Sequence, residues 1–353
     1  MNIAVSGDQS ILPNEKRDQP LDTLHTMRMM VWARYYWPIF DEQHLWDHQY
    51  QLMQRAKEAP IYYLGQGSNT VFMRNFKGLI VHLCTRGIEK LFENDQEVRI
   101  KVAAGENWHQ WVEYCVTKGW YGVENLVLIP GTVGAAPVQN IGAFGVEVAQ
   151  VVESVMIWDC QSGEYFTLSK DDCQFAYRSS IFQRQSQWLI ISIVFRLNKH
   201  FSANLTYQPL AQWWDEQIIQ RNSVPSARDL VNHIIEIRKS RLPDSKLLAN
   251  SGSFFYNPVI DAQQHKHLCH DYPDLPTYPT ADGRYKLAAA WMIDYLGLKG
   301  FSVGDMAVHQ NQALVLVNKG RGTPTQLLHL VKIIQQAVFS HFGVKFHTEP
   351  NLV

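Results

Sequence analysis

Residues 130–145 read Pro-Gly-Thr-Val-Gly-Ala-Ala-Pro-Val-Gln-Asn-Ile-Gly-Ala-Phe-Gly, and this stretch decides how the rest of the chain is interpreted. Its prolines and glycines are too frequent for a regular helix or strand. Small residues surround the pair Gln139 and Asn140, whose amides offer donors and acceptors suited to a heterocycle edge or a phosphate. The pattern predicts a long loop, either built for binding or poorly ordered.

A second glycine-rich loop, Gly-Gln-Gly-Ser-Asn at 65–69, follows the strand-like run 61–64. Glycines let backbone N–H groups approach phosphate oxygens without a Cβ in the way. This loop lacks the third glycine and the acidic residue of a dinucleotide fingerprint, and the stretch 130–145 lacks the Gly-Lys-Ser/Thr ending of a triphosphate loop. Both common nucleotide motifs are therefore excluded, and each loop taken alone is better explained as an ordinary turn.

Length and charge limit the class of protein. A chain of 353 residues predicts two or three domains. The 32 Lys and Arg residues balance 33 Asp and Glu residues, which leaves no basic field to attract nucleic acid or an anionic membrane. No apolar run is long enough to span a bilayer, and the polar start argues against a signal peptide. Five scattered cysteines without a Cys-x-x-Cys pair predict a reduced, cytoplasmic setting.

One cluster of potential metal ligands comprises His265, His267, Cys269 and His270. Structural zinc sites usually combine two separated pairs of ligands, and the sequence has no evident second pair. We interpret the cluster as a solvated loop or helix surface and expect no metal site.

The order of expected elements predicts the fold class. Strand-like runs occur at 61–64, 78–83, 98–102, 151–158, 189–197, 253–256 and 313–317. Three helices are expected after caps: one from Asn107 to about 119, one from Ser226 to about 242 and one from Thr323 to about 343. A fourth helix is expected over 286–296, ending at 297. This mixed order predicts an α+β fold rather than a doubly wound parallel sheet.

Read together, the two loops resemble the flavin-binding segments of the UDP-N-acetylenolpyruvoylglucosamine reductases. The other landmarks of that family follow in order: Phe-Ala-Tyr-Arg-Ser-Ser-Ile-Phe at 175–182, Gly-Ser-Phe-Phe-Tyr-Asn-Pro at 252–258 and His-Thr-Glu-Pro at 347–350. Leu-Thr-Tyr at 205–207 resembles the tyrosine-bearing loop of the longer subtype. The resemblance covers roughly residues 62–350.

The resemblance implies an FAD-binding region of two small α+β subdomains, of the PCMH or vanillyl-alcohol-oxidase type, and a separate α+β substrate-binding domain. We expect a flexible tail at 1–20 and FAD-binding subdomains at 21–90 and 91–242, the second joined by segment 343–353. The substrate-binding domain is expected at 243–342, after the break at Leu242 and Pro243.

The implied reaction reduces the enolpyruvyl ether of UDP-N-acetylglucosamine to UDP-N-acetylmuramate for peptidoglycan synthesis. NADPH reduces FAD and leaves, flavin N5 passes hydride to the methylene carbon of the substrate, and Ser253 gives a proton as general acid. No Gly-x-Ser-x-Gly elbow surrounds Ser253, which argues against a hydrolase nucleophile. Arg178 and Glu349 polarise the substrate carboxylate, and Glu349 must be protonated or share a proton to do so.

The remaining site residues follow from matching positions. The cofactor residues implied by the resemblance are Leu64, Gly65, Gln66, Gly67, Ser68, Asn69, Gly131, Gly134, Ala135, Gln139, Asn140, Ile141, Gly142 and Gly145. The implied substrate residues are Tyr177, Tyr207, Arg241, Lys246 and Asn257. Arg241 stands where the family has a lysine, and Tyr256 stands where it has a basic residue.

Two other functions stay open at this point. One is a different flavin oxidoreductase on the same fold, such as an oxidase, and the other is an inactive UDP-sugar-binding protein. The presence of Arg178, Ser253 and Glu349 together argues against the inactive protein. We expect a monomer.

Overall fold

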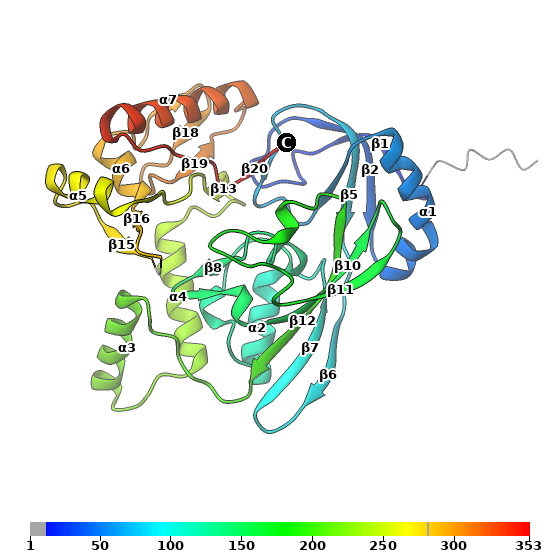
Figure 1. Cartoon of the computed structure of the whole chain (residues 1–353), viewed down its shortest axis with the longest axis horizontal. Coiled ribbons are helices and arrows are strands. Elements are labelled where there is room, and N and C mark those ends of the chain that lie inside the picture. The colour runs from blue at the N-terminus through cyan, green and yellow to red at the C-terminus, as the bar shows by residue number, and fades with distance from the viewer. Residues whose placement is uncertain (1–11, 281) are drawn as a thin grey trace, which may run out of the picture. The chain divides into compact units, whose positions relative to one another are not determined.

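The chain folds into two compact units. The structure is a computed structural model that describes residues 12–280 and 282–353, and Figure 1 labels its elements. Unit 1 consists of residues 12–19, Ala33–Gln66 and Lys77–Arg238. Unit 2 consists of Pro20–Trp32, Gly67–Phe76 and Lys239–Val353. The chain therefore passes repeatedly from one unit to the other.

Unit 1 begins with a four-stranded sheet in the order β1-β2-β5-β3. Its strands are β1 (Lys16–Pro20), β2 (Trp32–Ile39), β3 (Ile61–Leu64) and β5 (Phe76–Leu83). Helix α1 (Glu42–Glu58) begins at Asp41, whose carboxylate accepts the backbone N–H of His44 at 2.6 Å. Leu45 and Leu52 on one face of α1 are buried in the same core as the sheet, and this burial holds the helix in place.

A second sheet of unit 1 has the order β11-β10-β12-β7-β6, and its neighbouring strands are antiparallel. Its strands are β6 (Ile88–Glu93), β7 (Glu97–Ala103), β10 (Val152–Asp159), β11 (Tyr165–Ser169) and β12 (Trp188–Asn198). The central strand β12 is largely buried and pairs Ile193 with Val102 of β7. Its apolar run is typical of a strand covered on both faces.

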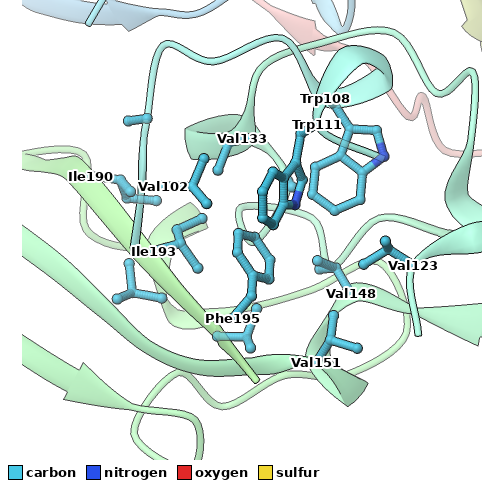
Figure 2. Close-up of a cluster of buried hydrophobic side chains, with 14 of the residues drawn as sticks. Val102, Trp108, Trp111, Val123, Val133, Val148, Val151, Ile190, Ile193 and Phe195 are labelled. Atoms are coloured by element: carbon cyan, nitrogen blue, oxygen red, sulfur yellow. The ribbon is translucent and has the colours of Figure 1, made fainter. Parts of the chain in front are cut away.

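The core of unit 1 lies where α2 (Trp108–Lys118) meets β12, and Figure 2 shows this region. The ring centres of Trp111 and Phe195 are 5.5 Å apart, and both side chains are essentially buried. Val133 belongs to the same cluster. Because Val133 is part of the stretch 130–145, core packing fixes the place where that loop starts.

The remaining elements of unit 1 connect or follow the two sheets. They are η1 (Glu124–Leu126), η2 (Val133–Ala135), β8 (Gly142–Ala143), β9 (Val146–Glu147), η3 (Val148–Gln150), η4 (Ile181–Gln183), α3 (Gln208–Arg221) and α4 (Ala227–Arg241). Helix α4 continues beyond Arg238 into unit 2.

The described residues of unit 2 form three sheets and three helices. Its strands are β4 (Thr70–Val71), β13 (Ala249–Ser253), β14 (Val259–Ile260), β15 (Thr277–Pro279), β16 (Tyr285–Leu287), β17 (Ser302–Val303), β18 (Met306–Val308), β19 (Val315–Asn318) and β20 (Asn351–Leu352). Its helices are α5 (Ala262–Asp271), α6 (Ala289–Tyr295) and α7 (Pro324–Phe342). The sheet orders are β13-β19-β18-β17, β14-β16-β15 and β20-β4.

Several expected elements are confirmed with their caps. Asn107 Oδ1 accepts Gln110 N at 3.0 Å at the start of α2, and Gly119 ends that helix with a φ of 72°. Helix α7 has a full capping box between Thr323 and Gln326. Local hydrogen bonding alone specifies these ends, so the sequence predicts them well.

The helix expected over 286–296 is wrong at its start. Residues Tyr285–Leu287 form β16, in which Lys286 pairs with both Val259 and Tyr278, and α6 begins only at Ala289. Pairing with strands distant in sequence overrides the local helical pattern at these positions.

The two units divide the chain differently from the expected domains. Segment 343–353 lies in unit 2, where β20 pairs in parallel with β4. Residues 1–11 of the expected tail lie outside the described residues, whereas 12–20 are docked, because Leu12 is fully buried and β1 joins a sheet. The flexible tail is therefore wrong for residues 12–20, and the division into two FAD-binding subdomains stays a prediction.

Within the described residues, no helix combines the length and the apolar character that crossing a bilayer requires.

A buried ion pair fastens the segment before β1 to α1. Arg55 Nη2 lies 2.9 Å from Glu15 Oε1, and the two side chains are 7% and 1% exposed. We expect Glu15→Ala to lower the free energy of unfolding by about 3 kcal/mol, because Arg55 keeps a buried charge without this partner. Urea unfolding followed by tryptophan fluorescence measures the change.

The matched control is Glu58→Ala, which removes the exposed partner of the same arginine at 3.2 Å. We expect a loss below about 1 kcal/mol for this variant. Equal losses from the two variants would contradict a special role for the buried pair.

Candidate functional site

The loop 130–145 is fixed to the start of helix α2 and to the loop 64–69. The backbone N–H of Trp108 donates to Gly131 O at 3.0 Å, and Val133 N donates to Glu106 O at 2.8 Å. Gln66 Oε1 accepts from Gly131 N at 2.9 Å. The side chain of Gln66 therefore joins the two glycine-rich loops within unit 1, as their expected common role requires.

Two glycines of these loops are required by close packing of the protein itself. A Cβ on Gly65 would lie 2.6 Å from Thr132 Oγ1, and a Cβ on Gly134 would lie 2.6 Å from the Cβ of Ala104. Gly134 N also donates to Ala104 O at 2.8 Å. The sequence predicts that these glycines let a ligand approach the backbone, and the structure shows that they also let the loop sit against the end of β7.

Asn140 is fully buried, and protein groups engage its amide. Its Nδ2 donates to Glu147 Oε2 at 2.8 Å and to Ala176 O at 3.1 Å, and its Oδ1 accepts from Ala149 N at 3.1 Å. The sequence predicts that this amide suits a heterocycle edge or a phosphate, and that role stays a prediction. Its three hydrogen bonds to protein groups show that Asn140 also shapes the loop.

Arg178 lies at the tip of a tight turn that rests on the same loop. Ala176 and Ser179 exchange backbone hydrogen bonds of 3.0 and 3.1 Å, and Arg178 has a φ of 50°, which is uncommon for a residue other than glycine. Its Nη2 donates to Gly142 O at 2.9 Å. Its guanidinium also lies over the Tyr177 ring, 5.4 Å from the ring centre. The structure thus brings Tyr177 and Arg178 to the expected flavin loop.

Tyr207 also reaches this loop, from the start of helix α3. Its ring meets the Phe144 ring edge to face with centres 5.3 Å apart. A Cβ on Gly145, whose φ is 82°, would overlap Thr206 Oγ1. Unit 1 therefore gathers Leu64, Gly65 and Gln66, the expected cofactor residues between 131 and 145, and the side chains of Tyr177, Arg178 and Tyr207.

Unit 2 brings Ser253 and Glu349 to adjoining backbone. Ser253 ends β13 after Gly252, which has a φ of 72°. The next residues run antiparallel to the segment that carries Glu349: Glu349 N donates to Phe254 O at 2.9 Å, and Tyr256 N donates to His347 O at 3.0 Å. Phe254 is fully buried and anchors this pairing.

The second half of the loop 64–69 belongs to the same region of unit 2. Asn351 N donates to Asn69 O at 2.9 Å, and Asn69 Nδ2 lies 3.5 Å from Glu349 O. Gly67 packs so closely on the backbone of His25 that a Cβ would lie 2.7 Å from its Cα. Gly67, Ser68 and Asn69 are therefore neighbours of Glu349 in unit 2.

The other expected substrate residues lie in unit 2 as well. Arg241 is the exposed last residue of α4, and Lys246 is exposed while its carbonyl accepts from Arg28 Nη2 at 2.7 Å. Asn257 Oδ1 accepts from Ala289 N at 3.0 Å at the start of α6. The carbonyl of Asn257 is thus used to cap a helix.

The sequence did not single out two residues that contact these loops, Glu147 and His82, or the buried Arg238 of unit 1. Glu147 holds Asn140, as described above. Burial lowers the pKa of His82, which accepts or donates a 2.7 Å hydrogen bond with Tyr36 Oη and also bonds the backbone of Gly65. Burial lowers the pKa of Arg238 to about 10, and its Nε has no hydrogen-bond partner among the described residues.

Helical periodicity was the available signal for Arg238, because it follows the buried Ile234 by four positions on α4. No comparable signal marks Glu147 or His82.

The histidine and cysteine cluster lies on α5 and at its end. His265 stacks on Tyr285 with ring centres 3.6 Å apart, and its Nε2 lies 3.0 Å from Thr277 Oγ1 and 3.2 Å from Cys269 Sγ. Across the described parts of the chain, no group of three or more His, Cys, Asp or Glu side chains is placed to hold a metal ion.

Two family models match the chain. Residues 51–169 match an FAD binding domain, and residues 243–353 match the C-terminal domain of UDP-N-acetylenolpyruvoylglucosamine reductase. A reductase of that name from Neisseria meningitidis serogroup A is 45% identical over 293 residues, which cover 82% of this chain and 84% of the relative. One from Pseudomonas putida is 39% identical over 333 residues, which cover 94% and 97%.

A solved structure also has this fold. The UDP-N-acetylenolpyruvylglucosamine reductase of Thermus caldophilus is 19% identical, with a TM-score of 0.64 over 96% of this chain and 98% of that chain. The expected α+β fold with an FAD-binding region of the PCMH type is confirmed.

The fold and the matched domains define the class of protein, which is an FAD-dependent oxidoreductase with a separate C-terminal domain. The full-length similarity to the bacterial enzymes then identifies the family. The chain belongs to the UDP-N-acetylenolpyruvoylglucosamine reductases.

The amide of Asn140 offers a test of how the loop is held. Asn140→Gly removes the amide while keeping a backbone φ of 43° accessible. We expect the free energy of unfolding to fall by about 2 kcal/mol, because Ala149 N and Ala176 O lose a buried partner. Urea unfolding measures this loss, and the flavin absorbance that remains after gel filtration measures the effect on the loop.

Asn140→Asp serves as a second variant, since it keeps an acceptor for Ala149 N but places a carboxylate beside Glu147. It should be at least as destabilising as the glycine variant. A change below about 0.5 kcal/mol in both variants would show that these hydrogen bonds do not hold the loop.

Proposed function

We propose that this chain is an FAD- and NADPH-dependent reductase that converts the enolpyruvyl ether of UDP-N-acetylglucosamine to UDP-N-acetylmuramate in peptidoglycan precursor synthesis. The observation that carries the proposal is the pairing of Ser253 with the Glu349 segment in unit 2, in a chain whose unit 1 sets Arg178 on the flavin loop. The relatives named UDP-N-acetylenolpyruvoylglucosamine reductase support the same activity.

The residues of the two loops fit FAD. Two glycine-rich loops joined by Gln66 offer backbone N–H groups, and the N-terminal end of α2 places partial positive charge beside Gly131. Arg238 adds a buried guanidinium N–H that needs an acceptor, and the carbonyl and diphosphate oxygens of FAD are acceptors. When bound, FAD supplies the hydride that it has received from NADPH to the methylene carbon of the substrate.

Ser253 supplies the proton in this proposal. Hydride addition to the methylene carbon leaves excess charge on the neighbouring carbon, which carries the ether oxygen and the carboxylate. A serine hydroxyl is a very weak acid, so it donates only to a strongly basic atom such as that carbon. The proton moves from Ser253 Oγ to the carbon, and no histidine partner is needed to activate the hydroxyl.

Arg178 and Glu349 act on the substrate carboxylate. The guanidinium of Arg178 has a planar set of donors that suits a carboxylate or a developing enolate. Its hydrogen bond to Gly142 O and its contact with the Tyr177 ring limit its rotation. Glu349 carries or shares a proton on its carboxyl group, because two bare carboxylates would repel each other.

The UDP part of the substrate is assigned to polar side chains at matching positions, namely Tyr177, Tyr207, Arg241, Lys246 and Asn257. Tyr207 lies in the loop that characterises the longer subtype, and we include that subtype in the proposal. Asn257 contributes through its amide nitrogen, since its carbonyl caps α6.

We further propose that the enzyme works as a monomer in the cytoplasm, without nucleic-acid or membrane partners. All five cysteines are unpaired, as a reducing compartment requires. The formal net charge of −1 gives no general attraction for nucleic acid or anionic lipid.

The proposed function is tested with the purified chain. We expect a yellow protein with a bound-flavin spectrum and an NADPH oxidation that depends on the enolpyruvyl substrate when oxygen is excluded. A colourless protein, or NADPH oxidation that ignores this substrate, would overturn the proposal. Faster reoxidation of the flavin by oxygen than by the substrate would indicate an oxidase instead.

Ser253→Ala tests the assignment of the proton donor. We expect the rate of substrate reduction by reduced enzyme to fall by a factor on the order of 10² to 10⁴, because the general acid is lost. Flavin reduction by NADPH, followed separately in stopped flow, should stay unchanged.

Ser251→Ala is the matched control, because Ser251 lies on the same strand and its buried hydroxyl has no hydrogen-bond partner among the described residues. Both half-reactions should survive in this variant. An equal fall of both half-reactions in Ser253→Ala would make Ser253 a structural residue.

A further inference from the structure

Asn125 is a buried asparagine that the proposed mechanism does not use. It lies in η1 of unit 1 and is 2% exposed. The neighbouring Glu124 holds η1 in place, because its two carboxylate oxygens accept from Gly122 N at 3.0 and 2.9 Å. Asn125 therefore projects its amide from a well-fixed backbone.

The amide of Asn125 joins two separate loops. Nδ2 donates to Phe144 O at 2.8 Å and to Asn204 O at 3.0 Å. Phe144 belongs to the flavin loop, and Asn204 lies three residues before Tyr207. A primary amide carries two N–H donors, so a single side chain satisfies one carbonyl of each loop.

The loop that Asn125 holds, residues 201–206, belongs to no helix or strand. Its apolar residues Phe201, Ala203 and Leu205 pack on the core of unit 1, so its polar turn is the part that depends on hydrogen bonds. Asn204 Oδ1 accepts from Thr206 N at 3.2 Å and from Thr206 Oγ1 at 2.8 Å, which forms a compact turn. Gly145 leaves the space that Thr206 occupies. The turn thus fits against the end of the flavin loop and leads directly to Tyr207.

Helix α3 is held mainly by its own buried face. Leu210 is fully buried and Trp214 is nearly so, and both belong to the core of unit 1. The Trp214 ring also meets Phe201 of the loop, with ring centres 6.1 Å apart. Loss of the Asn125 amide would therefore loosen the turn and the Tyr207 ring while the helix stays packed. The expected result is weaker substrate binding with little loss of folding stability.

We propose that Asn125 is a positioning residue that fastens the tyrosine-bearing loop to the flavin loop and so determines how tightly the UDP-sugar substrate is held. This rests on the proposed function, since Tyr207 is a substrate residue only there. In this proposal Asn125 acts through Tyr207, because its amide donates hydrogen bonds to backbone carbonyls of the two loops.

The test compares substrate affinity with chemistry. We expect Asn125→Ala to raise KM for the enolpyruvyl substrate by about tenfold, because two buried carbonyls lose their donor and the loop loosens. Both kcat and the rate of flavin reduction by NADPH should stay near the wild-type values. Asn204→Ala removes the side-chain hydrogen bonds to Thr206 in the same turn and should raise KM by a smaller factor. Asn232→Ala, at an exposed position of α4, is the control and should leave KM and kcat unchanged.

A double-variant comparison with Tyr207→Phe separates loop positioning from general damage. If Asn125 acts through Tyr207, Asn125→Ala raises KM much less in the Tyr207→Phe background than in the wild type. Equal factors in both backgrounds, or an unchanged KM in Asn125→Ala, would overturn the inference. If Asn125→Ala fails to retain FAD, the same comparison with Asn204→Ala decides between these outcomes.

Failure of the proposed function gives a different result. A wild-type enzyme that does not reduce the enolpyruvyl substrate overturns the function itself. Wild-type turnover with no change of KM in the loop variants overturns only the role of Asn125.

Discussion

Close approach of backbone segments around the stretch 130–145 is the constraint on which the candidate site depends. Gly134 rests on Ala104 and Gly65 rests on Thr132, at separations that leave no space for a Cβ. The buried Val133 then anchors the loop in the core of unit 1, and Asn140 ties it to the turn that carries Arg178. The position of the Arg178 guanidinium, which we propose to be catalytic, is therefore a result of packing several residues away from it.

Each proposed catalytic residue is supported by backbone that is itself held by buried groups. In unit 1, Arg178 reaches Gly142 O from a turn with a positive φ. In unit 2, Ser253 and Glu349 lie on segments joined by hydrogen bonds at Phe254 and Tyr256, on either side of Phe255. Such support is what a general acid and a carboxylate-binding group need, since small displacements cost much of their effect.

The sequence predicted the parts of the fold that local chemistry determines. The caps of α2 and α7 and the strand runs around β3, β7 and β12 follow from neighbouring residues and periodicity. Three other features depend on partners far along the chain, and no local sequence pattern predicts them. They are the start of α6, the docking of residues 12–20 and the pairing of β4 with β20. For the site, Arg178, Ser253 and Glu349 are predicted from the family resemblance and stay predictions. Glu147, Arg238 and Asn125 became visible only through their burial and hydrogen bonds.

The parallel pairing of β20 with β4 has a consequence for biosynthesis. Strand β4 is made early, yet its partner Asn351–Leu352 is translated only after the whole of α7. The ribosome must expose residues 351 and 352 before β4 can pair and before the Glu349 segment can settle beside Asn69. Unit 1 contains no residue beyond Arg238, so it can fold on the nascent chain while unit 2 is still incomplete.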